Sequence, residues 1–382
     1  MTSRPRILVL SFSAIARDAR VLRHVNVARQ LGDVITCGFG PRPDGVAEHV
    51  EVPTSYSLPQ TPAGVALLAT RRLEHAERAA PALRSALRLL EGRRFDVIVC
   101  NEARALPVAF DVADGAPVWA DMHEWAPQER SHDWRWRLLV APLAAHTCRR
   151  YLPRAAAVTT VGQAIADLYE RTFGVDCAVL RNAAPYVDLV PSPAEPGTIR
   201  VVHSGGAVPG RNIEMLIDAV GELGAPYRLD LYLVPANDRG VYLQQLEERA
   251  ASAAGVQLHP PVTPSELPYV LNRYDVGAYS IPPINVNTTY ALPNKFFDFV
   301  QARLALAIGP SVEMVRLTRE HDLGVVADDF GQASFVRALG SLTPESVAEY
   351  KRHASAAAHD LSSEREEQLT ADLIGRLLRM GG

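Results

Sequence analysis

The feature that most constrains the fold is an alternation of short apolar runs, rich in β-branched residues, with longer amphipathic stretches. This alternation is typical of βα units arranged around a parallel sheet. In the first unit, Arg6 to Phe12 predicts a buried strand, Val21 to Leu31 predicts a helix ended by Gly32, and Asp33 to Phe39 predicts the next strand. We therefore expect an α/β fold. The further strands are expected at Phe95 to Cys100, Pro117 to Asp121, Ala156 to Val161, Ala178 to Leu180, Thr198 to His203, Arg228 to Val234, Val256 to Leu258, Val276 to Ser280, Leu304 to Ile308 and Gly324 to Val326.

The alternation of apolar runs and amphipathic stretches stops once along the chain and then restarts. From Pro185 to Pro196 the sequence loses its periodicity and gains prolines, as an interdomain linker does. A chain of 382 residues also exceeds a typical single core. We expect two Rossmann-like domains, at residues 1–184 and 198–360, joined by a linker at 185–197. A C-terminal helix at 361–382, expected to cross back to the first domain, completes the chain.

Composition narrows the classes of partner and compartment. The hydrophobic content of 48% is that of an ordinary globular protein, and the formal net charge of −4 gives no overall attraction to nucleic acid. The four cysteines are scattered without a C-x-x-C pair, which argues against a disulfide framework or a zinc site. The apolar run from Ile7 to Leu10 is too short for a signal peptide or a membrane span. These features favour a cytoplasmic protein.

The loop after the first expected strand argues against one class of enzyme. Between Ile7 and Leu31 there is no glycine. The G-x-G-x-x-G turn that cradles the pyrophosphate of a dinucleotide is therefore absent, which argues against a dehydrogenase.

A glycine-rich loop opens the second half of the chain, in the sequence VVHSGGAVPGRN. Gly205 and Gly206 follow an expected strand and precede an expected helix, so their amides could approach phosphate oxygens at the helix N-terminus. Arg211 and Asn212 stand where a P-loop has its lysine and its Mg²⁺-binding hydroxyl, which argues against a P-loop kinase or ATPase. An arginine there still suits a diphosphate, because its planar fork binds two oxygens. The alternative is a flexible glycine turn with a solvated arginine.

A second polar loop, YSIPPINVNTTYALPNKFFDF, ends in an expected helix with Pro293 at its first turn. Asn294, Lys295 and Asp298 follow. Lys295 and Asp298 share a helix face near the positive N-terminal end, where one can bind phosphate and the other can accept hydrogen bonds from ribose hydroxyls. The alternative is a surface salt bridge between residues three apart.

In the first half, polar residues follow two of the expected strands. Asn101 and Glu102 come after one strand, and Asp121, His123 and Glu124 close the next. Ligands bind in open parallel sheets at the carboxyl ends of the strands, so these positions predict one wall of a cleft. Taken alone, the D-x-H-E sequence could equally be a capping and hydrogen-bonding turn.

Together these motifs resemble the family 4 group of retaining glycosyltransferases of the glycosyltransferase B-type (GT-B) fold. The likeness spans nearly the whole chain and rests on the order and spacing of DARVLRHVNVARQLGDVITCGF, WADMHEWAPQE, AVTTVGQAIADLY, VVHSGGAVPGRNIEMLIDAV, DVGAYSIPP and ALPNKFFDFVQARLALAIG. It implies two Rossmann-like domains that face each other across a cleft. It also implies that the C-terminal domain binds a nucleotide-sugar donor and the N-terminal domain binds an acceptor.

The resemblance assigns roles to individual residues of the C-terminal half. One position departs from the family: its last motif often has two glutamates eight residues apart, and here Tyr290 and Asp298 stand at those positions. The donor phosphates are assigned to Gly205, Gly206, Arg211 and Lys295, the ribose to Asp298, the surroundings of the base to Pro260, Pro261 and Val262, and contacts to the donor sugar to Asn285, Asn287, Thr288 and Asn294.

For the N-terminal half, the resemblance implies that Asp121, His123 and Glu124 are catalytic, by orienting the acceptor hydroxyl or stabilising charge. Asp18, Arg20, Asn101 and Glu102 are expected as acceptor contacts, although Asp18 could equally be a helix N-cap. The chain has no D-x-D pair to hold Mg²⁺ or Mn²⁺, so neither a metal nor another cofactor is expected.

The stretch 133–155 carries two tryptophans and five arginines. Such a helix could rest on anionic lipid and reach a lipid-linked acceptor. The alternative is an ordinary packed helix with a solvated basic face.

The leading hypothesis is a hexosyl-type glycosyltransferase that moves a sugar from a UDP-, GDP- or dTDP-sugar to a hydroxyl acceptor. The acceptor would be a saccharide, a lipid-linked glycan or a natural product, as in bacterial-type biosynthesis, and retention of configuration follows from the resemblance alone. The alternatives are a nucleotide-sugar epimerase or hydrolase and a non-catalytic nucleotide-sugar-binding protein, the last suggested by Tyr290. The oligomeric state is left open.

Overall fold

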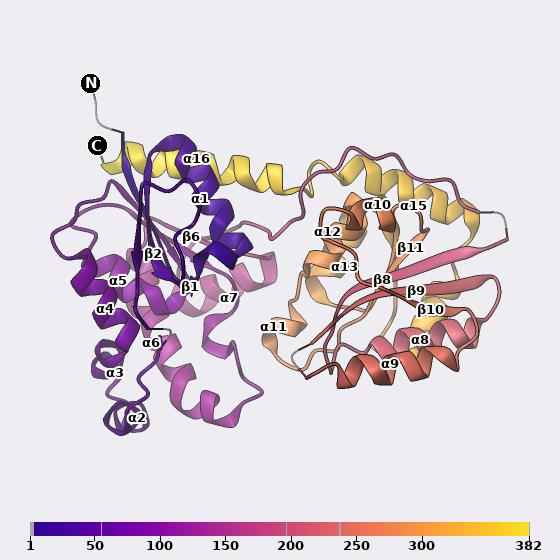
Figure 1. Cartoon of the computed structure of the whole chain (residues 1–382), viewed down its shortest axis with the longest axis horizontal. Coiled ribbons are helices and arrows are strands. Elements are labelled where there is room, and N and C mark those ends of the chain that lie inside the picture. The colour runs from indigo at the N-terminus through magenta and orange to yellow at the C-terminus, as the bar shows by residue number, and fades with distance from the viewer. Residues whose placement is uncertain (1–3, 55, 196, 237, 382) are drawn as a thin grey trace. The chain divides into compact units, whose positions relative to one another are not determined.

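The computed structural model describes residues 4–54, 56–195, 197–236 and 238–381. The chain forms two compact units (Figure 1). The N-terminal unit consists of Met1–Arg181, Asn285–Asn287 and Glu366–Gly382, and the C-terminal unit consists of Asn182–Ile284 and Thr288–Arg365. The segment expected as a linker, 185–197, is therefore grouped with the C-terminal unit.

The N-terminal unit is built on a parallel sheet of seven strands in the order β3-β2-β1-β4-β5-β6-β7. Residues Ile7 to Leu10 have no exposed surface, as expected of a strand covered on both faces. The strands are β1 (Arg6–Ala14), β2 (Asp33–Phe39), β3 (Glu48–Glu51), β4 (Val97–Asn101), β5 (Val118–Met122), β6 (Ala157–Thr160) and β7 (Cys177–Val179).

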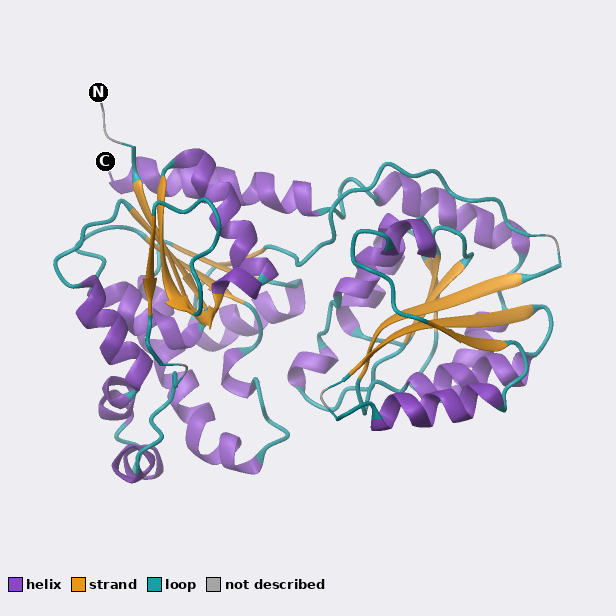
Figure 2. Ribbon diagram, in the orientation of Figure 1, coloured by secondary structure: helices purple, strands orange, loops and turns teal. Residues whose placement is uncertain are grey.

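Helices cover both faces of this sheet (Figure 2). They are α1 (Ala19–Leu31), α2 (Pro62–Ala69), α3 (Leu73–Ala79), α4 (Pro81–Leu90), α5 (Leu106–Asp111), α6 (Ala141–Tyr151) and α7 (Gln163–Phe173), with a π-helical turn at Trp136–Val140 and 3₁₀ turns at Ile15–Arg17, Ala103–Ala105, Ala126–Gln128 and Leu152–Arg154. The first helix ends where the glycine predicts. Gly32 is extended rather than left-handed, and it is required because a Cβ there would overlap the carbonyl oxygen of Pro5.

The C-terminal unit is built on a parallel sheet of six strands in the order β10-β9-β8-β11-β12-β13. Its strands are β8 (Ile199–Ala207), β9 (Tyr227–Pro235), β10 (Val256–His259), β11 (Val276–Tyr279), β12 (Ala305–Ile308) and β13 (Gly324–Val326). Its helices are α8 (Ile213–Leu223), α9 (Val241–Ala251), α10 (Leu267–Leu271), α12 (Asn294–Gln301), α13 (Val312–Glu320), α14 (Gln332–Gly340) and α15 (Pro344–Ala357), and α11 (Val286–Thr289) spans a boundary between the units.

The last helix, α16 (Ser363–Gly381), contributes to the N-terminal unit from Glu366 onward. Its apolar stripe of Leu373, Ile374 and Leu377 lies in one buried cluster with Ile7 and Val9 of β1. The C-terminal residues therefore complete the core against which α1 also packs. The expectation that the helix crosses back to the first domain is confirmed.

The predicted strands all form, with ends that differ by a few residues, but several elements were missed. β3 was missed because its sequence, EHVE, is mostly polar. The helices α2, α3 and α4, between Pro62 and Leu90, were not predicted. In the part of the chain that the structure describes, no helix combines the length and apolarity needed to cross a membrane.

Candidate functional site

Each sheet has one point where its strand order reverses, and ligands bind open parallel sheets at the carboxyl ends of the strands beside such a point. In the N-terminal unit the reversal lies between β1 and β4, and in the C-terminal unit it lies between β8 and β11. The predicted residues of the two units follow these strands and their neighbours.

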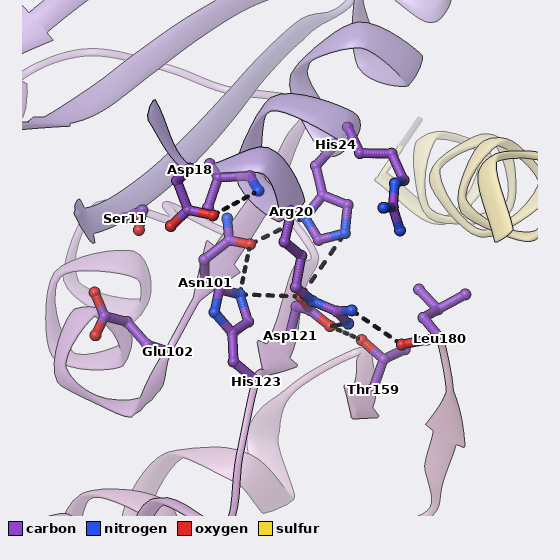
Figure 3. A network of polar contacts seen from close by, with 12 residues as sticks. Ser11, Asp18, Arg20, His24, Asn101, Glu102, Asp121, His123, Thr159 and Leu180 are labelled. Carbon is purple, nitrogen blue, oxygen red and sulfur yellow. Dashed lines mark hydrogen bonds and ion pairs between the residues drawn. The ribbon is translucent and has the colours of Figure 1, made fainter. Parts of the chain in front are cut away.

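A buried ion pair anchors the site of the N-terminal unit (Figure 3). Arg20 of α1 donates Nε and Nη2 to the two carboxylate oxygens of Asp121, each at 2.7 Å, and its Nη1 donates to the carbonyl oxygen of Leu180 at 3.0 Å. The Thr159 hydroxyl donates to the same carboxylate at 2.6 Å. Although burial disfavours the charged form, Arg20 and its neighbours hold the pKa of Asp121 well below its usual value.

Two imidazoles complete this network around Asn101 (Figure 3). His24 Nδ1 lies 3.0 Å from Asn101 Oδ1, and burial lowers the pKa of His24 to about 4. The neutral ring therefore donates from Nδ1. His123 Nε2 lies 3.4 Å from both Asn101 Oδ1 and Asp121 Oδ2. Because both neighbours are acceptors, the hydrogen of His123 belongs on Nε2, which leaves Nδ1 free to accept.

Beside His123 is a cavity of ≈ 200 Å³ that Glu102 and Glu124 also line. Glu102 has a left-handed backbone (φ 70°), uncommon for a residue with a side chain, and its Oε1 accepts from the Phe12 amide at 2.9 Å. Arg104 binds its other oxygen at 2.9 Å. Burial and the nearby Glu129 raise the pKa of Glu124. The structure thus brings His123, Glu102 and Glu124 together at one cavity.

The other predicted residues of this unit lie away from the cavity surface. Asp121 and Asn101 have no exposed surface, and Arg20 is 6% exposed. Asp121 and Asn101 each lie 3.4 Å from His123 Nε2, and Arg20 reaches this network through Asp121. The carboxylate of Asp18 accepts from the Val21 amide at 3.2 Å, so Asp18 is the N-cap of α1.

In the C-terminal unit, β8 extends through Gly205 and Gly206, which were predicted as a loop, and Lys295 lies against Gly205. Gly205 has a φ of 125°, and a Cβ there would overlap Lys295 Nζ. Lys295 is 8% exposed, and its ammonium lies 5.4 Å from the centre of the Tyr279 ring. Burial and the charge of Arg211 lower the pKa of Lys295 to about 8. The positive side chains of Lys295 and Arg211 thus lie beside two residues that have no side chain of their own, Gly205 and Gly206.

The predicted alternative, a surface salt bridge between Lys295 and Asp298, does not form. Among the residues described, no carboxylate oxygen lies within 4.0 Å of Lys295 Nζ or of the Arg211 guanidinium. Burial raises the pKa of Asp298 to about 6. A buried ammonium without a counterion is costly, and an anionic ligand is one way to offset that cost.

Two residues under Lys295 were missed by sequence reasoning. His203 of β8 stacks on Tyr279 of β11, with ring centres 5.8 Å apart. Its Nδ1 lies 2.9 Å from the Ala278 carbonyl oxygen, and burial lowers its pKa to about 3. His203, Tyr279 and Lys295 form a stack that holds the ammonium in place. Only the pairing of β8 with β11 brings them together, so no sequence motif could have revealed it.

The remaining predicted residues fall in three places. Pro260, Pro261 and Val262 follow β10. Asn285 and Asn287 lie in the segment grouped with the N-terminal unit, and Thr288 is grouped with the C-terminal unit. Asn294 begins α12 and accepts a hydrogen bond from Asn182 at 2.9 Å. Within the ranges that the structure describes, no group of three His, Cys, Asp or Glu side chains is placed to hold a metal ion.

Comparison with known proteins gives one family and many structures. The model of Glycosyltransferase Family 4 matches residues 29–185. HepE of Anabaena in complex with UDP superposes with a TM-score of 0.67 at 14% identity, over 97% of this chain and 100% of that chain. Sucrose-phosphate synthase from Thermosynechococcus elongatus gives 0.67 at 11% identity, over 99% and 100% of the two chains.

A third structure, described as trehalose-6-phosphate from E. coli bound with UDP-2-fluoro glucose, gives a TM-score of 0.63 at 10% identity over 98% of this chain and 99% of that chain. At these identities the likeness shows a shared fold. No protein among the curated sequences matches this one.

Proposed function

We propose that this chain, a family 4-like protein of the GT-B fold, transfers a sugar from a nucleotide-sugar donor to a hydroxyl acceptor. The observation that carries the proposal is the pair of cations, Lys295 and Arg211, beside Gly205 and Gly206. A diphosphate is the ligand that offers charge to both side chains, and the glycines leave room for it to approach the backbone.

In the proposed reaction, the bond between the anomeric carbon and the diphosphate breaks, and the nucleoside diphosphate leaves with the electron pair. The acceptor oxygen forms the new bond to the anomeric carbon and gives up its proton. Lys295 and Arg211 stabilise the charge that develops on the leaving diphosphate, which is the step where preorganised positive charge lowers the barrier. The retaining outcome, with the proton passing to a departing phosphate oxygen, is part of the proposal by family resemblance.

We assign acceptor binding to the cavity of the N-terminal unit. His123 presents Nδ1 as a hydrogen-bond acceptor that orients the acceptor hydroxyl, and Asp121 and Asn101 fix the ring through Nε2. Asp298 remains the proposed contact for the ribose, Pro261 and Val262 for the base, and Asn285, Asn287, Thr288 and Asn294 for the donor sugar. Related structures carry UDP or UDP-glucose, so UDP-glucose is the first donor to test.

The test is the affinity for UDP, measured by isothermal titration calorimetry on the full chain. Replacing Lys295 or Arg211 by alanine is expected to weaken binding by about tenfold or more, because each removes a charge-assisted contact to phosphate. Arg249→Ala, which removes an exposed arginine paired with Asp218, is the matched control. Unchanged affinity in both site variants would refute the phosphate assignment.

The non-catalytic alternative is favoured by one observation, namely that Tyr290 replaces the first glutamate of the family motif. Incubation with UDP-glucose and an acceptor mixture separates the possibilities. Free UDP that appears only with acceptor supports transfer, and a new nucleotide sugar without acceptor supports an epimerase. Tight donor binding without turnover supports a binding protein. We propose that donor binding needs no metal, so chelation with EDTA should leave the UDP affinity unchanged.

We also propose that the protein works in the cytoplasm, with peripheral contact to anionic membranes through the stretch 133–155. Trp136 is packed in the core at 7% exposure, but Trp134 and Leu138 are 58% and 53% exposed. Co-sedimentation with vesicles containing phosphatidylserine tests this contact. Binding that is lost on Trp134→Ser supports it, and no binding by the unaltered protein would overturn it.

A further inference from the structure

The cavity of the N-terminal unit combines a carbon-rich wall with an excess of negative charge. Leu83 of α4, Leu143 of α6, Trp136 and Met122 contribute apolar surface to it. His123 lines the same cavity, so a molecule bound there contacts the imidazole that the proposed function uses. A ligand with a flat apolar face fits such a wall better than a fully hydroxylated one does, because water leaves both surfaces on binding.

Four carboxylates, those of Glu77, Glu102, Glu124 and Glu129, line the cavity with a single arginine. That arginine, Arg104, is already shared by two of the carboxylates, since its Nη2 lies 2.9 Å from Glu102 Oε2 and 3.6 Å from Glu129 Oε1. The formal charge of the lining is therefore negative, because four carboxylates outnumber the one guanidinium. An anionic ligand such as a phosphorylated sugar would meet repulsion there.

Glu77 is a buried carboxylate of this lining without a direct Lys or Arg partner among the described residues. It is 5% exposed, and its two oxygens accept from the Thr147 hydroxyl at 3.1 Å and from the Tyr151 hydroxyl at 2.8 Å. Among the described residues no Lys or Arg nitrogen lies within 4.0 Å of it. Each carboxylate oxygen keeps a further acceptor site after one hydrogen bond, so an ammonium group can be added without displacing either hydroxyl.

We propose that the acceptor bound in this cavity is a hydroxylated molecule with an apolar or aromatic body and an ammonium group, held through the ammonium by Glu77 and the neighbouring carboxylates. This inference rests on the proposed function, because it names the substrate class of the acceptor site. It selects against phosphorylated acceptors by charge and against fully polar sugars by the apolar wall.

Binding is tested without donor, so that the result does not depend on turnover. Phenyl glucosaminide, its N-acetyl counterpart and glucosamine 6-phosphate are titrated into the full chain by isothermal titration calorimetry at pH 7. The amine probe is expected to bind at least about tenfold more tightly than the N-acetyl probe, because a charge-assisted hydrogen bond contributes about that much to affinity. The phosphorylated probe is expected to bind most weakly. Equal affinity for amine and N-acetyl probes would overturn the proposal.

Glu77→Gln identifies the anchor, because it keeps the shape and removes the charge. This substitution should abolish the preference for the amine probe. Glu48→Gln removes one carboxylate charge on β3, outside the cavity, and should leave the preference intact. If Glu77→Gln does not fold, Glu129→Gln on the cavity rim replaces it with the same expected loss. A preference for the amine that survives the substitutions at Glu77 and Glu129 contradicts the assignment.

UDP titration of the same preparations keeps this proposal distinct from the proposed function. Normal UDP binding with no preference among the three probes leaves the transferase proposal standing and overturns the acceptor class. A preference for the amine probe without UDP binding supports the ligand class of the cavity and overturns the transferase proposal.

Discussion

At the scale of single residues, the two sites differ in how their charges are balanced. In the N-terminal unit, the charges of Asp121 and Arg20 neutralise each other in the interior. Arg20 also donates to the Leu180 carbonyl oxygen, and Asp121 also accepts from the Thr159 hydroxyl. In the C-terminal unit, Lys295 is nearly as buried but has no carboxylate partner within 4.0 Å among the described residues. The first arrangement is complete in itself, whereas the second favours a ligand.

Removing one member of the buried ion pair should be far more costly than removing an exposed one. Asp121→Asn is expected to lower the free energy of unfolding by about 3 to 5 kcal/mol, because Arg20 is left buried without a counterion. Asp111→Asn, which breaks an exposed pair with Arg78, should cost less than about 1 kcal/mol. Urea denaturation of the two variants measures the difference, and similar losses would show that the buried pair has no special weight.

The buried histidines predict how stability depends on pH. Burial lowers the pKa of His24 to about 4 and that of His203 to about 3, below the value of an unfolded histidine near 6.5. Between those values the unfolded chain binds protons that the folded chain does not, so stability falls as the pH falls below about 6.5. Urea midpoints from pH 7.5 to 5 should decrease, and a flat profile would contradict the burial of neutral imidazoles.

The lysine of the donor site should make UDP affinity depend on pH in the alkaline range. The pKa of Lys295 is lowered to about 8, so the ammonium loses its charge as the pH rises through that value. UDP affinity is expected to fall between pH 7 and 9.5 in the unaltered protein. Lys295→Arg should remove this fall, because a guanidinium stays charged throughout the range. Equal pH profiles for both proteins would rule out Lys295 as the group responsible.

At the scale of elements, Gly205, near the end of β8, is required by a contact rather than for flexibility. Gly205→Ala would place a Cβ on Lys295 Nζ at a φ of 125°, where side chains are rarely tolerated. We expect UDP affinity to drop by about tenfold or more. Gly210→Ala has a left-handed φ but open space around it, and it should affect stability more than binding. Calorimetry and thermal melting of the two variants separate these effects.

The strands were predictable because each one covered on both faces needs a continuous apolar run, as Val97 to Cys100 provides. β3 was not, because a short edge strand such as EHVE carries no such run. For the loops, local sequence pointed to individual residues but not to their contacts. Gly205 and Lys295 were identified from local sequence, but their contact and the stack of His203 on Tyr279 depend on the pairing of β8 with β11.

Asp121 shows the same limit in the other unit. Its position after a strand suggested a catalytic carboxylate, but its partner Arg20 lies 101 residues away in sequence. Local patterns cannot reveal whether a charge is neutralised by a distant one. For this reason the sequence could point to the polar residues near the strand ends as a group, but which of them line the cavity depended on the fold.

At the scale of the whole molecule, the two units have separate hydrophobic cores. Calorimetry is therefore expected to show unfolding that is not a single two-state transition. Saturating UDP should raise the midpoint of one transition and leave the other nearly unchanged, since only the C-terminal unit is proposed to bind it. An equal shift of all transitions would show that the units unfold together.

The return of α16 to the N-terminal unit has a consequence for synthesis on the ribosome. The first seven strands are translated early, but Leu373, Ile374 and Leu377, which share a buried cluster with β1, are made only after all the strands of the C-terminal unit. Until they emerge, the part of this apolar face that α1 does not cover is open to aggregation or to chaperones. The N-terminal unit is therefore completed only after the C-terminal unit has been translated.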